Sequence, residues 1–85
     1  MKWVNFTDSN TGQKSKIQVC RIQQVGMYIN IDDGQNGFIT INAMTLGNAT
    51  AMIGQIYKLF EDNDEIKFDQ PLLYTPYAGE TGGKS

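Results

Sequence analysis

Apolar and polar side chains alternate most regularly between residues 25 and 42. An alternation with a period of two is typical of a β-strand that buries one of its faces. The alternation is interrupted by the segment 32–37, which is rich in Asp, Asn and Gly and suits a tight reversal of the chain. The pattern therefore predicts a β-hairpin over residues 25–42. Its predicted buried positions are Val25, Met27, Ile29, Ile31, Ile39 and Ile41.

Three further segments alternate over shorter lengths. Residues 2–6, 16–23 and 65–69 each predict a strand. In the second of them the apolar side changes near Val19 and Cys20, so that either both faces are covered there or a bulge redirects the strand. The third predicted strand is followed by Pro71, which would restrict it to the edge of a sheet.

Residues 46–61 change to the period of a helix. Their apolar residues fall on one face at spacings of three and four, and Thr45 or Asn48 can cap the start. A helix of this length is marginal in water, so burial of that face against a sheet must stabilise it. The predicted buried helix positions are Ala49, Met52, Ile53, Ile56, Leu59 and Phe60.

Together these elements predict an α+β fold. We expect an antiparallel meander of four to five strands, with one amphipathic helix packed on one face. Residues 1–74 form a single domain in this interpretation. Residues 75–85 show no packing pattern and are predicted to be a flexible C-terminal tail.

The length and the composition limit the class of protein. A chain of 85 residues and 9.5 kDa has room for one domain, and 40% hydrophobic residues are enough for a core. This composition excludes a collagen-like chain, a coiled coil and a fully disordered chain. No apolar run approaches the ~18 residues of a membrane span, so no membrane association is expected. The N-terminus becomes polar too early for a signal peptide, which predicts a cytoplasmic protein.

The chain contains one cysteine, Cys20, and no histidine. It therefore cannot build an internal disulfide or a nucleophile–histidine pair. A structural zinc site needs about four nitrogen or sulfur ligands, which the chain does not supply. We accordingly predict a protein without catalytic residues, metal or cofactor. Cys20 lies in an apolar strand and is predicted to be a buried structural thiol.

Charge is distributed unevenly along the chain. Residues 1–24 carry four basic side chains and one acidic one, a net charge of +3, whereas residues 61–69 carry five acidic side chains and one lysine, a net charge of −4. A pI near 4.8 argues against a general nucleic-acid binder, although a local basic strip is compatible with it. The adjacent carboxylates Asp32 and Asp33 point apart at a strand end and are predicted to be turn residues.

The function predicted from these observations is non-catalytic binding to another protein. An inhibitor or adaptor of the kind encoded by phages and mobile elements would fit, and open sheet edges favour a homodimer. If the isoleucines of the hairpin are buried, its other face points outward. The predicted partner-binding residues on that face are Tyr28, Asn30, Phe38 and Thr40.

The alternative is a single-stranded nucleic-acid-binding protein. Outward aromatic rings can stack on bases while neighbouring cations pair with phosphates. The residues of this alternative site are Lys14, Lys16, Arg21, Tyr28 and Phe38. A third possibility is that the two rings pack beneath the C-terminal tail or in a subunit contact.

The segment 38–42, which runs directly into the predicted helix, resembles the whirly-type family of single-stranded DNA-binding proteins. The resemblance covers about a third of the chain and implies dimerisation through the helix and sheet edges, together with binding of single-stranded DNA. It assigns no role to an individual residue. The short hairpin, the few basic residues and the acidic segment after the helix depart from that family's pattern.

Overall fold

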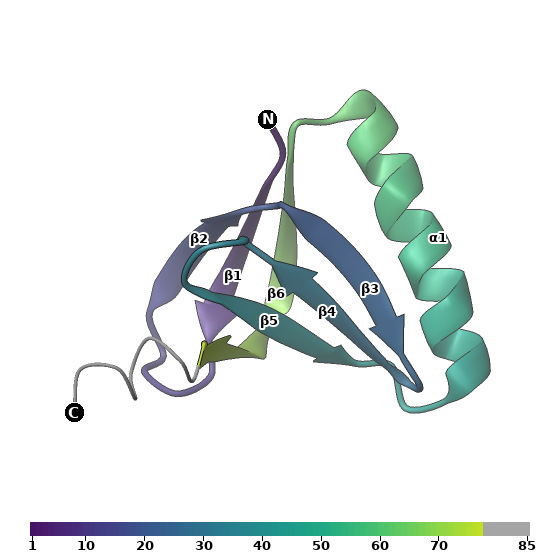
Figure 1. Cartoon of the computed structure of the whole chain (residues 1–85), viewed down its shortest axis with the longest axis horizontal. Coiled ribbons are helices and arrows are strands. Elements are labelled where there is room, and N and C mark those ends of the chain that lie inside the picture. Colours follow the sequence, from purple (N-terminus) through teal and green to yellow (C-terminus); the bar gives the residue numbers. More distant parts are fainter. Residues whose placement is uncertain (78–85) are drawn as a thin grey trace.

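Six strands and one helix make up residues 1–77, the part of the chain that this computed structural model describes (Figure 1). The elements are β1 (Trp3–Asp8), β2 (Lys14–Gln18), β3 (Arg21–Val25), β4 (Tyr28–Asp32), β5 (Gly37–Asn42), α1 (Leu46–Asp62) and β6 (Glu65–Pro76). The strands form one sheet in the order β2-β1-β6-β5-β4-β3. The α+β class with one helix is confirmed. The predicted number of strands is wrong, and so is the purely antiparallel sheet, because β1 and β6 pair in parallel.

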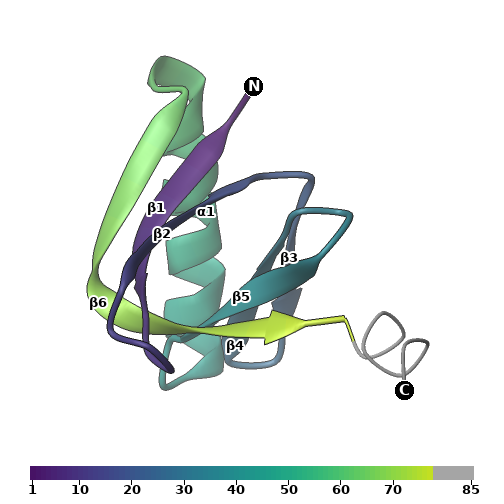
Figure 2. The same cartoon turned by 90° about the vertical axis from the view of Figure 1, so that its left-hand side faces the viewer.

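The sheet is folded into two walls that face each other. Figure 2 shows β1 and the first half of β6 on one side, and β3, β4 and β5 on the other. Strand β6 belongs to both walls, because its first half pairs with β1 and its second half with β5. It bends where its register shifts: Asn5 lies opposite Lys67, but Thr7 lies opposite Pro71. An irregularity of this kind tolerates a proline inside a sheet, so β6 is a central strand and not the predicted edge strand.

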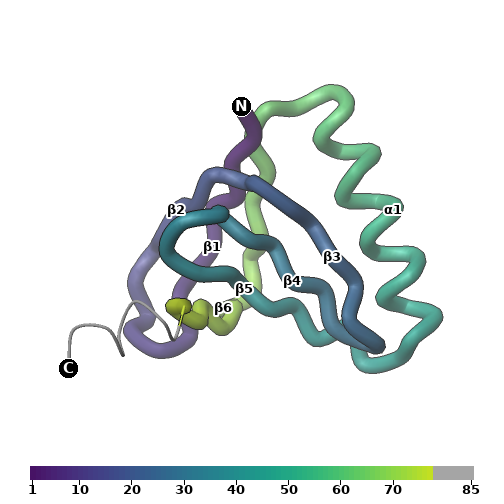
Figure 3. Tube along the Cα trace, in the orientation of Figure 1, coloured from purple at the N-terminus to yellow at the C-terminus, as the bar shows by residue number. Residues whose placement is uncertain are grey.

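The segment predicted as one strand over residues 16–23 is two strands at opposite edges of the sheet. Val19 N–H donates to the carbonyl of Lys2, at 2.8 Å, and extends the pairing of β2 with β1. The next N–H, that of Cys20, donates to the carbonyl of Asp32, at 2.7 Å, and begins the pairing of β3 with β4. The tube in Figure 3 follows the chain from β2 into β3 without a reversal. The shift of the apolar pattern at Val19 and Cys20 marks this passage from one wall to the other.

One apolar core lies between the two walls. It joins Val4 of β1 with Ile29 and Ile31 of β4 and Ile39 of β5, all of which are fully buried. The hairpin β4–β5 is confirmed, with its predicted isoleucines inside. Two of the predicted buried positions are wrong. Met27 lies in the turn between β3 and β4 and is 36% exposed, and Val25 belongs to β3, outside the β4–β5 hairpin, and is 48% exposed. Gly26 supplies the positive φ of +62° that this turn requires.

Helix α1 covers the core beside β3 and β4 (Figure 1). Thr45 is its N-cap, and the Thr45 hydroxyl accepts the N–H of Asn48 at 3.0 Å. At the other end the Lys2 ammonium donates to the carbonyl of Phe60 at 2.8 Å, which places a cation at the negative end of the helix dipole. The helix buries Ala49, Ile56 and Phe60, whereas Met52 and Ile53 are partly buried.

Two predictions at the ends of these elements need correction. Leu59 was predicted to be buried but is 49% exposed, because it lies at the margin of the apolar face. Strand β6 continues to Pro76, past the predicted start of the tail at residue 75, and Tyr77 N–H donates to the carbonyl of Asn36 at 2.9 Å. The rest of the predicted tail, residues 78–85, lies outside the described residues.

Candidate functional site

The side of β3, β4, β5 and β6 that points away from the core forms the first candidate surface, which we call the hairpin face. The strand register places Gln23, Asn30, Thr40 and Leu73 in one row across the four strands. Val25 and Tyr28 form the neighbouring row, and Arg21, Asp32 and Phe38 form the row on the other side. The hairpin face is made of Arg21, Gln23, Val25, Tyr28, Asn30, Asp32, Phe38, Thr40, Asn42, Leu73 and Thr75.

Apolar side chains surround a polar strip on the hairpin face. Val25, Tyr28 and Leu73 are 48%, 38% and 47% exposed. In the strip between them, the Thr40 hydroxyl donates to the side-chain oxygen of Asn30 at 3.2 Å. All four predicted partner-binding residues therefore share this face. Helix α1 lies on the core side of the sheet and leaves the hairpin face open (Figure 2).

Phe38 is less available than Tyr28. Its ring is half-buried and lies against Tyr77, with 6.4 Å between the ring centroids and a tilt of 40°. This contact agrees with the third possibility stated for Phe38, packing beneath C-terminal residues, but it does not involve Tyr28. The exposed aromatic surface of the hairpin face is consequently concentrated at Tyr28.

A buried carboxylate organises the Phe38 end of the hairpin face. Asp32 accepts hydrogen bonds from the Tyr77 hydroxyl, the backbone N–H of Gly34 and, at 3.4 Å, the Arg21 guanidinium. Burial by itself would raise the pKa of Asp32, but the hydrogen bonds from Tyr77, Gly34 and Arg21 outweigh it and hold the pKa below its usual value. The hydrogen bond to Asp32 also raises the pKa of Tyr77 to about 12.

The neighbouring carboxylate closes the turn between β4 and β5. Asp33 accepts the backbone N–H groups of Gln35, Asn36 and Gly37 at 2.9, 2.7 and 3.1 Å. Its burial would raise the pKa, but these three hydrogen bonds lower it overall. The two adjacent carboxylates thus have different partners: Asp33 closes the turn of the hairpin, and Asp32 also links the hairpin to Tyr77.

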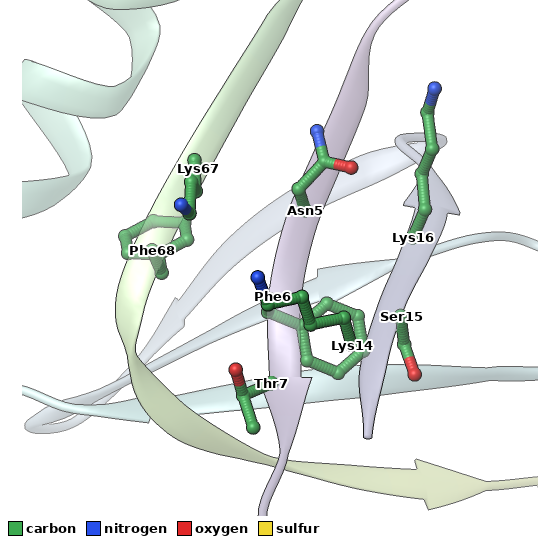
Figure 4. Close-up of a pocket in the computed structure, with 8 residues that line it drawn as sticks. All are labelled: Asn5, Phe6, Thr7, Lys14, Ser15, Lys16, Lys67 and Phe68. Atoms are coloured by element: carbon green, nitrogen blue, oxygen red, sulfur yellow. The ribbon is translucent and has the colours of Figure 1, made fainter. Parts of the chain in front are cut away.

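The outer side of the other wall forms the second candidate surface, which we call the lysine face (Figure 4). The register places Lys16 and Lys67 on either side of Asn5, and Lys14 opposite Thr7. The alternate residues on these strands, Val4, Ile17 and Ile66, point into the core. A shallow depression lies over this face. Its lining includes the outward side chains of Asn5, Thr7, Lys14, Lys16 and Lys67, together with Ser15, which shares the inward side of β2 with Ile17.

The lysine face carries both cations and anions. Lys16 lies 3.1 Å from Glu65, and Asn5 also donates to Glu65, at 2.8 Å. The hydrogen bond from Asn5 and the contact with Lys16 lower the pKa of Glu65. Lys16 further lies 5.0 Å from the centre of the Trp3 ring, which makes a cation–π contact. Lys67 lies 3.9 Å from Asp69, and within residues 1–77 Lys14 has no ion-pair partner.

The residues of the alternative nucleic-acid site fall on both walls. Lys14 and Lys16 lie on the lysine face, whereas Tyr28, Phe38 and Arg21 lie on the hairpin face. Both faces point away from the same core, so they lie on opposite sides of the molecule (Figure 2). The guanidinium of Arg21 is paired with Asp32.

Sequence reasoning missed the partners that complete each surface. Lys67 and Tyr77 come from β6 and its end, more than 40 residues along the chain from the residues they join. A local sequence pattern does not indicate which distant residues pair with each other. The prediction that Cys20 is buried is also wrong, because the thiol is exposed where the chain passes from β2 to β3.

Residues 1–77 contain no group of three or more His, Cys, Asp or Glu side chains arranged to hold a metal ion. Within the same range no helix is long and apolar enough to cross a membrane. No protein-family model, no curated protein and no solved structure matches this chain. Function therefore has to be argued from the two surfaces themselves.

Proposed function

We propose that this chain is a small non-catalytic binding protein of the inhibitor or adaptor type, which contacts a protein partner through the hairpin face. The observation that supports this proposal is the pattern of exposure on that face. Three apolar side chains, Val25, Tyr28 and Leu73, are exposed around a strip of amide and hydroxyl groups. Aromatic and apolar anchors beside hydrogen-bonding groups are typical of the centre of protein interfaces.

Buried side chains and hydrogen bonds hold the strands of the hairpin face in place. Ile29, Ile31 and Ile39 alternate with the outward residues and are completely buried, so the strands that present the face are held firmly. The Asp32 network and the Asp33 turn also fix the end of the hairpin. A surface that is ordered before binding loses less conformational entropy when a partner docks.

Site-specific crosslinking tests the proposal. A photoreactive phenylalanine analogue would replace Tyr28 on the hairpin face in one variant and Leu59 on α1 in a matched control, since both residues are exposed. We expect a discrete crosslinked protein from the native host with the Tyr28 variant only. The additional substitution Leu73→Ala should weaken that crosslink. Equal crosslinking from both positions would contradict a partner site on the hairpin face.

The predicted homodimer remains part of this proposal and has its own measurement. Size-exclusion chromatography with light scattering gives the mass in solution directly. A dimer that dissociates on Tyr28→Ala would make a second copy the partner at the hairpin face. A strict monomer would leave only a different protein as the partner.

Single-stranded nucleic acid is the second candidate, and one observation favours it. Lys14, Lys16 and Lys67 converge on one face beside Trp3, which provides cations and an aromatic ring together. The ring would have to be released from Lys16 before a base could stack on it. If three phosphates are contacted, the affinity should fall with salt at a log–log slope of about −2. The absence of oligothymidylate binding at low salt would remove this candidate.

A further inference from the structure

The two edges of the sheet differ in what covers them. Along β3, the edge strand of the hairpin wall, side chains of α1 reach the backbone and its neighbours: the Tyr57 hydroxyl donates to the carbonyl of Ile22 at 3.2 Å, and Gln24 bonds to Thr50 at 3.1 Å. Strand β2 is the other edge of the sheet, and no strand of residues 1–77 lies beyond it. Within the described residues, one edge is therefore closed by the helix and the other is open.

The register shows which backbone groups are open on β2. Two hydrogen-bonded pairs mark the ends of the β1–β2 pairing: Val19 with Lys2, and Asp8 with Gln13. Since hydrogen-bonded pairs alternate with non-hydrogen-bonded pairs in an antiparallel ladder, every second residue of β2 between them bonds to β1. Ile17 and Ser15 consequently point their N–H and C=O groups at β1. The intervening residues point theirs away from the sheet. These residues are Lys14, Lys16 and Gln18.

Two of the three outward side chains along this open edge, Lys14 and Lys16, are cationic, and Lys16 also pairs with Glu65. Lys14 and Lys16 lie on the lysine face, and Lys67 lies on the same face two strands further in. A strand added to β2 would place its own outward side chains opposite Lys14 and Lys16, at the short distance of cross-strand neighbours. Opposite charges are favoured in such pairs and like charges are disfavoured.

We propose that β2 binds an extended acidic segment of a partner protein, which adds a strand to the sheet and places alternate carboxylates opposite Lys14 and Lys16. The backbone groups of Lys14, Lys16 and Gln18 provide the hydrogen bonds, and the lysines select for charge. A second copy of this chain is a poor occupant, because antiparallel pairing of β2 with its own copy about Ser15 or Lys16 would place lysine opposite lysine. This site is separate from the hairpin face, and either proposal can fail without the other.

The test uses short peptides titrated into the full chain and observed by backbone amide NMR. A peptide in which Glu alternates with Val should bind, and peptides with Gln or Lys in place of Glu should bind roughly tenfold more weakly or not at all. Strand addition, unlike a loose ionic contact, should slow hydrogen exchange at the amides of Lys14, Lys16 and Gln18. Oligothymidylate is titrated in parallel.

Charge reversal sharpens the test. The double substitution Lys14→Glu/Lys16→Glu should transfer the preference to the Lys–Val peptide. If this variant does not fold, Lys14→Gln/Lys16→Gln replaces it in the test and should lower the preference for the Glu–Val peptide. The control, Lys58→Glu, makes the change of charge of one of these two reversals at an exposed position of α1 and should leave the preference unchanged. Tyr28→Ala should also leave it unchanged.

Several results would overturn the proposal. One is equal weakening by Lys58→Glu, which would indicate a response to net charge alone. Another is peptide binding without protection of the three amides. Binding of oligothymidylate but not of the acidic peptide would assign the lysines to nucleic acid. Binding of neither would leave them the role of guarding an edge strand against aggregation.

Discussion

The wall that carries the hairpin face and the wall that carries the lysine face share one core, but their charged side chains differ in burial and in bonding. At the end of the hairpin face, Asp32 is buried and accepts hydrogen bonds from Arg21 of β3, from Gly34 in the turn after β4 and from Tyr77 after the end of β6. On the lysine face, Glu65 and Lys16 form an ion pair in which both side chains are about half exposed. A buried carboxylate with several donors holds segments together, whereas an exposed ion pair contributes little to stability and remains free to exchange partners. The comparison separates a structural charge from charges that are available for binding.

The largest expected effect concerns the core that both walls share. Ile39→Ala, on the hairpin wall, should lower the free energy of unfolding by about 2–5 kcal/mol, because the side chain is completely buried. Val4→Ala, on the lysine wall, should also destabilise the protein. Chemical denaturation followed by tryptophan fluorescence and circular dichroism measures both. Each variant should show one coincident transition, and separate transitions would mean that the two walls unfold independently.

The next effect concerns the place where β6 joins the hairpin wall. A Cβ atom at Gly37 would lie 2.3 Å from the carbonyl oxygen of Thr75, so Gly37→Ala must push β5 and β6 apart. We expect a loss of about 1–3 kcal/mol or more in the free energy of unfolding. The matched control is Gly54→Ala on α1, where a Cβ meets open space and should stabilise the helix by about 1 kcal/mol. Equal effects of the two substitutions would contradict the close approach at Gly37.

The Asp32 network provides the third test. Asp32→Asn should lower the free energy of unfolding by about 1–3 kcal/mol, because the amide presents donors where Tyr77 and Gly34 also donate. Tyr77→Phe removes only the hydroxyl and keeps the ring beside Phe38, so its cost should be smaller. In a double-mutant cycle the two effects should be less than additive. Full additivity would mean that Asp32 and Tyr77 act separately.

The same network gives stability a dependence on pH at both extremes. The pKa of Asp32 is lowered in the folded chain, so its contribution is present above the ordinary pKa of about 4 and is lost as the pH falls through the folded value. The pKa of Tyr77 is raised to about 12, so its contribution is present below pH about 10 and is lost as the pH rises toward 12. Tyr77→Phe should remove the alkaline loss. Thermal unfolding across the pH range measures it.

The smallest expected effect lies on the lysine face. Lys16→Met should change the free energy of unfolding by about 0–1 kcal/mol, because its ion pair with Glu65 is exposed. The difference in the free energy of unfolding between this variant and the unsubstituted protein should decrease at high salt, because salt screens the ion pair. Unfolding curves at low and high ionic strength check this. A loss as large as that of Asp32→Asn would cancel the distinction between the two charged groups.

What the sequence predicted depends on how far apart the interacting residues lie. The hairpin β4–β5 and helix α1 follow from neighbours a few residues apart, so their periods are sufficient to predict them. Of the two predicted caps, Thr45 and Asn48, Thr45 is the N-cap. The predictions that Val25, Met27 and Leu59 are buried are wrong because these residues continue a period past the end of the buried surface. The parallel pairing of β1 with β6 could not be inferred, since about 60 residues separate the partners.

The same reasoning explains which parts of the surfaces were found. The sequence predicts correctly that one face of the hairpin holds Tyr28, Asn30, Phe38 and Thr40. Side chains of a strand alternate between its two faces, so the burial of Ile29 and Ile39 is enough to turn their neighbours outward. The union of Lys14 and Lys16 with Lys67, and that of Asp32 with Tyr77, depends on the path of β6. The break at Val19 and Cys20 was visible as a change of side, but a pattern cannot show that the two halves belong to opposite edges.

The central position of β6 has a consequence for how this chain becomes a folded protein during synthesis. Translation produces β1 and β2 first, then β3, β4 and β5, and each of these two groups can pair only within itself. Nothing joins them into a single sheet until residues 65–76 have emerged from the ribosome and been inserted between β1 and β5. The nascent polypeptide therefore leaves one edge of β1 and one edge of β5 without a neighbouring strand while α1 is made, and the last strand to be synthesised completes the sheet.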